Sequence, residues 1–161
     1  MTDQLPAAVV VASNRAASGV YEDTTGPVIV DWLVEQGFAC AAPAVVPDGD
    51  PVGAAIRDAV EAGARVVLTT GGTGLTPTDR TPEATRPLLD REVPGIAEAI
   101  RAYGLQAGVP TAMLSRGLAG VAGQCLVVNL PGSRGGVRDA LAVLEPVLRH
   151  AVEQVVGSDH S

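Results

Sequence analysis

The chain has 161 residues and a formal net charge of −7, and all 11 of its basic side chains are arginines. The absence of lysine excludes Schiff-base enzymes, pyridoxal-phosphate enzymes and the Walker-type loop, each of which needs a lysine. The excess of acid and an aromatic content of only 2% argue against binding to nucleic acid or to anionic membrane surfaces.

The first expected elements are a buried strand and an amphipathic helix. Residues 7–12 form an unbroken aliphatic run, which is typical of a strand buried on both faces. Thr24 or Thr25 is expected to cap the helix that follows, with Pro27 in its first turn and Gly37 at its end. The side chains expected to face the core are those of Val30, Leu33 and Val34.

The next expected elements are an interrupted strand, a helix and a third strand. Pro43 is expected to interrupt the strand region at residues 38–46, or to confine it to an edge, because proline cannot donate to a ladder. A helix is expected from Asp50-Pro51 to a stop at Gly63, with Ile56, Ala59 and Val60 on one face. Residues 65–70 then predict a short strand that leads directly into a glycine-rich loop.

The second half of the chain predicts helices at residues 81–89 and 94–103, strands at 111–115 and 125–130, and a C-terminal helix. Thr81 is the expected cap of the first of these helices. Apolar residues recur at helical spacing from Val137 to Val155, and Pro146 is expected to kink or split that helix. The alternation of strands and helices, without a polar linker, predicts one α/β domain over residues 1–161.

The four cysteines and histidines are not expected to carry chemistry. Cys40 and Cys125 lie in apolar runs and are expected to be reduced core residues, and His150 is expected on a helix surface. Neither these cysteines nor His150 and His160 are spaced for a histidine triad or a zinc cluster. Because no apolar run approaches the roughly 20 residues of a membrane span and the start lacks a basic region, a cytoplasmic protein is expected.

Two glycine-containing loops follow predicted strands, at residues 71–74 and 131–136. Ligands of open α/β sheets bind outside the carboxyl ends of the strands, so both loops are in the expected position. The amides of the first loop can approach an anion closely, and neighbouring threonines add hydroxyl donors. The second loop begins the last helix, whose N-terminus favours phosphate. The alternative is that these glycines only form tight turns.

Carboxylates and one arginine also follow predicted strand ends. Asp48 and Asp79 are candidates to share Mg²⁺ with substrate phosphates. The alternative is a turn residue for Asp48 and an acid preceding a helix for Asp79. Arg116, after Ser115, is a candidate planar donor to phosphate or to a heterocycle carbonyl, and a surface salt bridge is its alternative.

A longer motif connects these residues to a known family. Residues 69–85, TTGGTGLTPTDRTPEAT, resemble the signature of the MogA/MoaB family of molybdenum cofactor biosynthesis proteins, which bind molybdopterin. The resemblance covers nearly the whole chain. It includes SNR at 13–15, SGVYED at 18–23, VVPD at 45–48, PGIAEA at 94–99, LSR at 114–116, GVAG at 120–123 and NLPGS at 129–133.

The resemblance implies a three-layer α/β/α sandwich with a mainly parallel central sheet, and an adenylyl transfer. In that reaction the terminal phosphate of molybdopterin attacks the α-phosphorus of Mg·ATP and pyrophosphate is released. Asp48 and Asp79 would be the catalytic residues and the Mg²⁺ ligands. The residues implied in binding molybdopterin and ATP are Ser13, Gly71, Gly72, Thr73, Gly74, Thr78, Ser115, Arg116, Asn129, Pro131, Gly132 and Ser133.

Two other functions stay open, namely a non-catalytic molybdopterin carrier or scaffold that passes its ligand to a molybdenum insertase, and a generic nucleotide-binding module. The resemblance also implies a homotrimer, and a hydrophobic content of 47% gives such an assembly apolar surface to bury. Residues 75–78 replace a segment that is often more basic in the family. Neutralisation of phosphate is therefore expected to depend on Arg80, Arg116 or the metal.

Overall fold

The structure is a computed structural model that describes residues 4–20 and 22–157. Its centre is a seven-stranded sheet in the order β2-β1-β4-β7-β6-β5, with β3 also paired to β1. Pairing is parallel from β2 and β3 through β1 and β4 to β7, and antiparallel at β6 and β5. The strands are β1 (Pro6–Ala12), β2 (Ala39–Cys40), β3 (Ala44–Val46), β4 (Val66–Thr70), β5 (Arg91–Glu92), β6 (Ala119–Ala122) and β7 (Cys125–Leu130).

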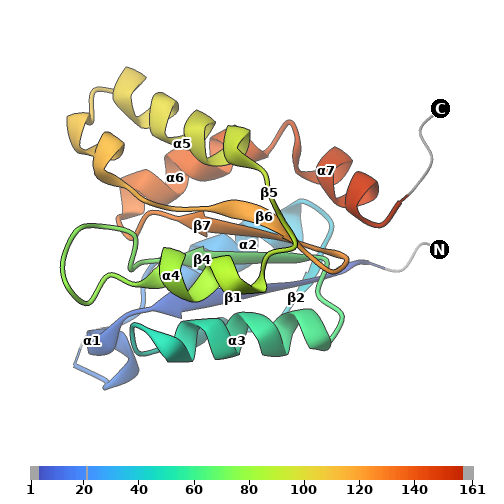
Figure 1. The fold of residues 1–161 in the computed structure, drawn as a ribbon, viewed down its shortest axis with the longest axis horizontal. Coiled ribbons are helices and arrows are strands. Elements are labelled where there is room, and N and C mark those ends of the chain that lie inside the picture. The colour runs from blue at the N-terminus through green and yellow to red at the C-terminus, as the bar shows by residue number, and fades with distance from the viewer. Residues whose placement is uncertain (1–3, 21, 158–161) are drawn as a thin grey trace.

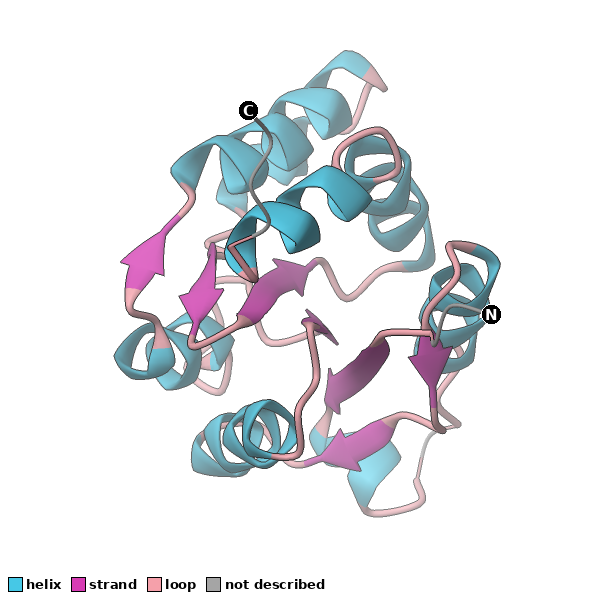
Figure 2. Ribbon diagram, turned by 90° about the vertical axis from the view of Figure 1, so that its right-hand side faces the viewer, coloured by secondary structure: helices cyan, strands magenta, loops and turns pink. Residues whose placement is uncertain are grey.

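Helices cover both faces of the sheet, as Figures 1 and 2 show. They are α1 (Asn14–Ala17), α2 (Gly26–Glu35), α3 (Asp50–Glu61), α4 (Thr81–Thr85), α5 (Pro94–Gln106), α6 (Arg134–Leu144) and α7 (Leu148–Val155), with 3₁₀ turns at Arg86–Leu88 and Pro110–Leu114. Helices α2, α5, α6 and α7 share one apolar core with the sheet, whereas α3 and α4 pack against the other face. The predicted three-layer sandwich with a mainly parallel sheet is confirmed.

The alternation of side chains along the strands produces these two cores. In β4, Val66 and Leu68 face the helices of the larger core, and Val67 faces α3. All five residues of β4 are buried, including Thr69 and Thr70, which explains why its sequence shows no alternation of apolar and polar residues. The cores are built mainly from aliphatic side chains, and the aromatic Phe38 is the largest side chain that is fully buried.

Most of the predicted elements are confirmed. The strand region at 38–46 is interrupted at Pro43, and the C-terminal helix divides into α6 and α7 around Pro146. Cys125 is buried, which raises the pKa of its thiol to about 12, whereas Cys40 is only half-buried and His150 is exposed on α7. Across residues 4–20 and 22–157, no helix combines the length and apolar character needed to cross a membrane.

The predicted strand at residues 111–115 is wrong. The segment forms a 3₁₀ turn, in which the amide of Ala112 donates to Val109 O and that of Ser115 donates to Ala112 O. Pro110 opens this turn, where its fixed φ is suited to a helical start and its missing N–H costs nothing. The strands β5 and β6, which the sequence did not predict, occupy the antiparallel edge instead.

Three smaller expectations about helix ends and faces are also corrected. Val34 is 48% exposed, because Ile29 and Leu33 form the buried stripe of α2. Thr25 occupies the N-cap position of α2 as expected, but its side chain makes no capping hydrogen bond, and the amide of Gly26 donates to Asp23 Oδ1 instead. Thr81 is the first residue of α4 rather than its cap, and its buried hydroxyl donates to Gly71 O.

Candidate functional site

The candidate site lies where the loops after β1, β4 and β7 leave adjacent strands at one edge of the sheet. Because these strands are parallel, their carboxyl ends meet at this edge. The loops after β1 and β7 lead to α2 and α6 on one face, whereas the loop after β4 leads to α4 on the other. Their divergence leaves a crevice on each side of the end of β4.

Glycines allow these loops to pack backbone against backbone. Gly71 has φ +90°, and a Cβ added there would overlap the carbonyl oxygen of Ala12. A Cβ on Gly132 would lie 3.2 Å from the Cα of Gly71. The hydroxyl of Thr70 donates to Pro131 O at 2.7 Å, which joins the end of β4 to the loop after β7. The glycines are therefore required by close approach as well as by turn geometry.

Two cavities occupy the crevices. The larger, of about 580 Å³, is lined by Gly72, Thr73, Gly74, Leu75, Thr76, Asp79, Thr111, Leu114, Ser115, Pro131, Gly132 and Ser133. The smaller, of about 310 Å³, is lined by Val11, Ala12, Ser13, Ala16, Glu22, Asp23, Thr24, Thr25, Thr70, Gly71, Gly132, Ser133 and Arg134. Both volumes are in the range of small-molecule pockets, and Gly132 and Ser133 line both.

Most of the predicted binding residues line these two cavities, and four of the predicted site residues do not. Asp48 lies beside the glycine loop, Thr78 is exposed, and Arg116 and Asn129 support the walls. Thr76, one of the loop threonines expected to add a hydroxyl donor, also lines the larger cavity. The sequence assigned no role to Thr111 and Leu114 in the larger cavity or to Arg134 in the smaller one. Leu114 lies in the family segment LSR, which was a signal for it, whereas no local pattern marked Thr111, because its segment was predicted to be a strand.

The two aspartates lie at successive glycines of the loop after β4. A Cβ built on Gly72 would be 3.2 Å from Asp48 Oδ1, and one built on Gly74 would be 2.8 Å from Asp79 Oδ2. The amide of Asp48 donates to Asn14 Oδ1 at 2.9 Å, which fixes the turn after β3. The amide of Thr76 donates to Asp79 Oδ2 at 3.1 Å, which fixes Asp79 within its loop.

The electrostatics of this pair favour a cationic ligand. Burial raises the pKa of the Asp48 carboxyl, and the negative charge of Asp79 raises it further, while hydrogen bonding to the Asn14 backbone opposes both effects. Among the residues that the structure describes, no group of three or more His, Cys, Asp and Glu side chains could hold a metal. A two-carboxylate set fits Mg²⁺, which uses one or two carboxylates together with substrate phosphates.

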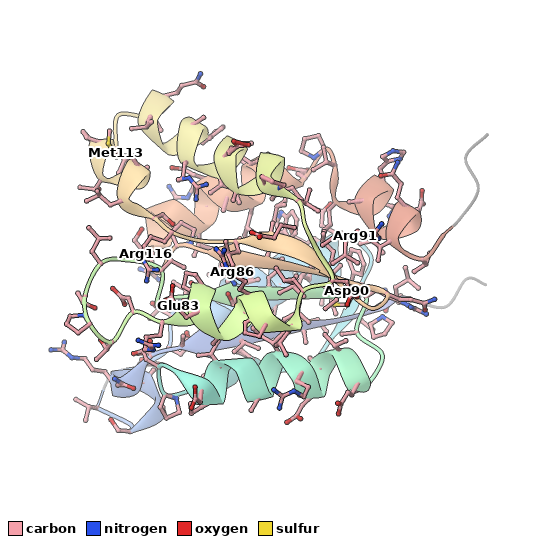
Figure 3. All side chains as sticks on the ribbon, viewed as in Figure 1. Glu83, Arg86, Asp90, Arg91, Met113 and Arg116 are labelled. Carbon is pink, nitrogen blue, oxygen red and sulfur yellow. The ribbon has the colours of Figure 1, made fainter. Side chains whose placement is uncertain are left out.

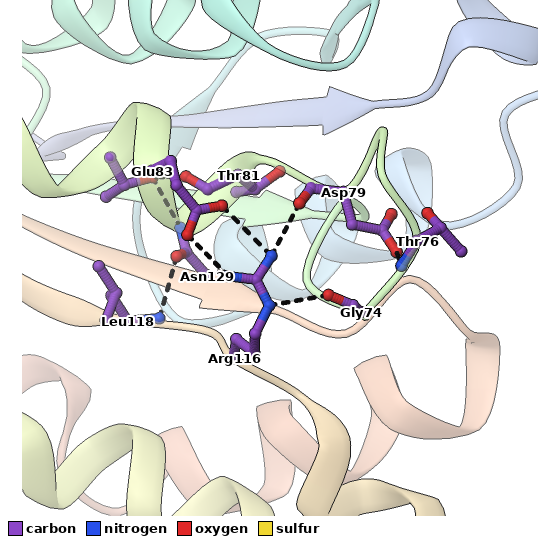
Figure 4. Close-up of polar contacts among 9 residues, drawn as sticks. Gly74, Thr76, Asp79, Thr81, Glu83, Arg116, Leu118 and Asn129 are labelled. Atoms are coloured by element: carbon purple, nitrogen blue, oxygen red, sulfur yellow. Dashed lines mark hydrogen bonds and ion pairs between the residues drawn. The ribbon is translucent and has the colours of Figure 1, made fainter.

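Arg116 fills the space between the loop and α4, as Figure 4 shows. Its Nε donates to Gly74 O at 2.9 Å and its Nη2 donates to Asp79 O at 2.7 Å. The guanidinium also forms a two-point ion pair with Glu83, at 2.7 and 3.2 Å. Hydrogen bonding to Arg116 lowers the pKa of Glu83, and the same bond raises the pKa of Arg116. The sequence indicated no ion pair for Glu83, although this residue lies inside the family motif.

Asn129 joins four segments beneath the site. Its Nδ2 donates to Thr69 Oγ1 at 2.9 Å and to Thr85 Oγ1 at 3.2 Å, and its Oδ1 accepts from the amide of Leu118 at 3.0 Å. The hydroxyl of Thr85 donates in turn to Thr81 O at 2.7 Å. The Thr81 hydroxyl donates to Gly71 O, so this chain of bonds reaches the glycine loop itself.

Serines shape the remaining walls. Ser13 and Ser133 are N-caps, with Oγ accepting from the amides of Ala16 and Gly136 respectively. The 11-residue helix α6 therefore starts beside both cavities, where its N-terminal amides favour an anion. Ser115 Oγ lies 3.5 Å from Thr73 Oγ1 across the larger cavity wall.

Comparison with known proteins agrees with this arrangement. Residues 8–150 match the family described as "Probable molybdopterin binding domain". The molybdopterin adenylyltransferase of Haemophilus influenzae is 39% identical over 146 residues, which cover 88% of this chain and 73% of that protein. A solved structure, the molybdopterin biosynthesis Mog protein from Mycobacterium ulcerans, is 56% identical with a TM-score of 0.90, and the match covers 94% of this chain and 99% of that one.

Some curated relatives are longer proteins. The molybdenum cofactor biosynthesis bifunctional protein of Synechococcus elongatus is 41% identical over 155 residues, which cover 96% of this chain but only 48% of that protein. The chain thus spans about half the length of this relative, and 49% of the bifunctional protein of Chlorobaculum tepidum. The predicted resemblance to the MogA/MoaB proteins is confirmed, and the chain belongs to the molybdenum cofactor biosynthesis family that this molybdopterin-binding domain defines.

Proposed function

We propose that this chain is a molybdopterin adenylyltransferase. The observation that carries the proposal is the meeting of the glycine–threonine loop, Asp79 and the N-terminus of α6 around cavities of small-molecule size, with Asp48 beside the loop. A relative from Haemophilus influenzae, of which the match covers 73%, is named for this activity. Such a site can hold several phosphates without lysine, because amides and hydroxyls supply the donors.

The reaction needs no covalent nucleophile from the protein. A terminal phosphate oxygen of molybdopterin forms a bond to the α-phosphorus of ATP, the bond from that phosphorus to the β-phosphate oxygen breaks, and pyrophosphate leaves. The amides of the loop at 71–74 and the start of α6 are assigned to orient the phosphates. Asp48 and Asp79 are assigned to hold Mg²⁺. When bound, the metal would neutralise the negative charge of the substrate phosphates, which an acidic chain would otherwise repel.

The individual binding roles follow the cavity walls. Ser13, Thr73, Ser115, Ser133 and the glycines between them are proposed to contact the two substrates, and Thr78 to reach them from the exposed rim. Pro131 contributes its ring to the larger cavity. For Asn129 and Arg116, the bonds described above support a role in holding the walls.

The wider setting is part of the same proposal. Residues 1–161 are taken to form a single molybdopterin-binding domain that assembles as a homotrimer in the cytoplasm. A molybdenum insertase is proposed to take the adenylylated product.

The test is an assay of the purified chain with molybdopterin, ATP and Mg²⁺. We expect release of pyrophosphate together with adenylyl-molybdopterin detected by mass spectrometry, and loss of both after chelation of the metal. Asp79→Asn should reduce the rate by about 10²-fold or more, whereas Asp58→Asn, on the exposed side of α3, should not change it. Tight pterin binding without pyrophosphate release would reject the enzyme and favour a carrier.

A further inference from the structure

The loop of residues 73–80 has few bonds of its own, although it carries Asp79. Inside it, the amide of Asp79 donates to Thr76 O at 3.0 Å, and the amide of Thr76 donates to the Asp79 carboxylate. Residues 75–78, at the tip, are exposed. A loop of eight residues with so few internal bonds has low local stability unless contacts from outside the loop support it.

Arg116 supplies that support at both ends of the loop. Its amide donates to Thr73 O at 2.8 Å, its Nε to Gly74 O, and its Nη2 to Asp79 O. The carbonyls of Gly74 and Asp79 are five residues apart in the chain, yet they converge on one guanidinium (Figure 4). The Arg116 side chain thereby joins the two ends of the loop and fixes the main chain of Asp79.

Glu83 fixes the guanidinium to the rest of the fold. Its two carboxylate oxygens accept from Nη1 and Nη2, and it lies on α4, which packs against α3. Figure 3 shows Arg116 beside Glu83 of α4, with Arg86 farther along the chain in the 3₁₀ turn that follows α4. A lysine could not replace this arrangement, because a point charge cannot bond in one plane to two carbonyls and a carboxylate.

We propose that Arg116 is a positioning residue, which with Glu83 as its counter-charge holds the loop of residues 73–80 so that Asp79 faces the larger cavity. The inference rests on the proposed function, because it gives Asp79 a task that depends on its position. It also replaces the expectation that the Arg116 guanidinium binds substrate. That guanidinium already makes four hydrogen bonds within the protein.

The first test needs no substrate. Hydrogen exchange of the full chain should show the amides of Thr76 and Asp79 exchanging about tenfold faster or more in Arg116→Gln, with peptides from β4 and β7 unchanged. Arg116→Lys should recover only a small part of the protection, and Glu83→Gln should give an intermediate rate. Arg86→Gln is the matched control, because Arg86 faces Glu92 at 4.0 Å on the surface and should leave the loop as it is in the parent chain.

The second test separates positioning from substrate binding. In the adenylyl-transfer assay we expect Arg116→Gln to lower kcat at least tenfold while KM for ATP changes less than threefold. The double variant Arg116→Gln/Glu83→Gln should be no worse than Arg116→Gln alone, since both act through one contact.

The outcomes are distinct. Unchanged exchange at residues 74–80 in Arg116→Gln, or a rise in KM alone with the loop still protected, overturns the proposal. If the parent chain transfers no AMP, the proposed function fails, and the exchange result still decides whether Arg116 holds the loop. If Arg116→Gln does not fold, Glu83→Gln carries the exchange test, and exchange like that of the parent chain in this variant overturns the pairing.

Discussion

At the scale of single residues, the Asp48 carboxyl is held where its charge is unfavourable. Burial raises its pKa, and the nearby charge of Asp79 adds to the effect. A carboxyl with a raised folded-state pKa binds protons more tightly in the folded state, so its contribution to stability declines as pH rises from the unfolded value of about 3.9 through the folded value. Carboxylates with raised pKa values are typical of functional sites, where a charge that lowers the stability of the fold is kept because the function needs it.

We therefore expect Asp48→Asn to stabilise the protein at pH 7 while it reduces AMP transfer. The gain in free energy of unfolding should be at most about 1 kcal/mol, because the carboxyl is only half-buried, and should vanish below about pH 3.9, where the acid is protonated in both states. Urea unfolding at pH 7 and pH 3.5 measures it, with Asp58→Asn as the surface control. A variant less stable than the parent chain at pH 7 would show that the charge is favourably placed.

Arg116 illustrates which residue roles a sequence can reveal. The strand predicted before it is a 3₁₀ turn, so only the family segment LSR at residues 114–116 indicated a place near the site. Its partners Glu83 and Gly74 lie 33 and 42 residues away in the chain, and no local pattern connects them to it. The glycine loop and the aspartates could be placed from the sequence, because both follow strands whose ends meet in any parallel sheet. The role of each side chain at these strand ends depends on long-range contacts, which only the folded structure defines.

At the scale of elements, the side chain of Asn129 joins two strands, β7 and β4, to helix α4 below the site. It connects β7 to β4 through Thr69, to α4 through Thr85 and to the segment before β6 through the amide of Leu118. Asn129 is 4% exposed, and Thr69 and Thr85 are both fully buried, so water cannot easily replace a lost partner. Removing the amide leaves buried groups without hydrogen bonds, which costs about 1–3 kcal/mol for each group that cannot find another partner.

We expect Asn129→Ala to lower the free energy of unfolding by about 2–3 kcal/mol. Thr85→Val should also destabilise, and the double variant should lose clearly less than the two single losses combined, because both changes break the same network. Denaturant unfolding of the four proteins gives the coupling. Additive losses would mean that the Asn129–Thr85 bond contributes nothing of its own.

The antiparallel edge of the sheet shows where element prediction failed. β6 is a short strand rich in alanine and glycine, so it has none of the β-branched pattern that identified β4. A signal was nevertheless present, because only Gly123 and Gln124 separate β6 from β7, and Gly123 has φ +61°. Glycine at the first position of a two-residue turn is typical of a hairpin. The strands β1, β4 and β7 could be predicted without a turn signal, because strands buried on both faces are rich in aliphatic residues.

At the scale of the whole molecule, exposed apolar side chains gather at one end. Tyr103, Leu105, Val109, Met113 and Leu114 are each between 42% and 60% exposed, and they belong to the end of α5 and the 3₁₀ turn packed against it. Figure 3 shows Met113, a residue of that turn, at this end. We call these five side chains the 103–114 patch. With a net charge of −7 on each copy, electrostatics oppose association, so apolar contact must drive any assembly.

The proposed homotrimer can therefore be tested through both electrostatic repulsion and apolar contact. Light scattering should give about three times the chain mass of 16.3 kDa, and added salt should strengthen the assembly, because it screens like charges and leaves apolar contacts intact. Leu105→Glu combined with Met113→Glu should reduce the mass to that of one chain, since burying two unpaired carboxylates costs several kcal/mol. Val34→Glu, at an equally exposed position on α2, is the control and should leave the mass unchanged. A single-chain mass for the parent protein would reject the trimer. A trimer that survives the double substitution would place the contact on another face. Added salt should still strengthen that trimer, because each copy carries the same net charge of −7 whichever faces meet.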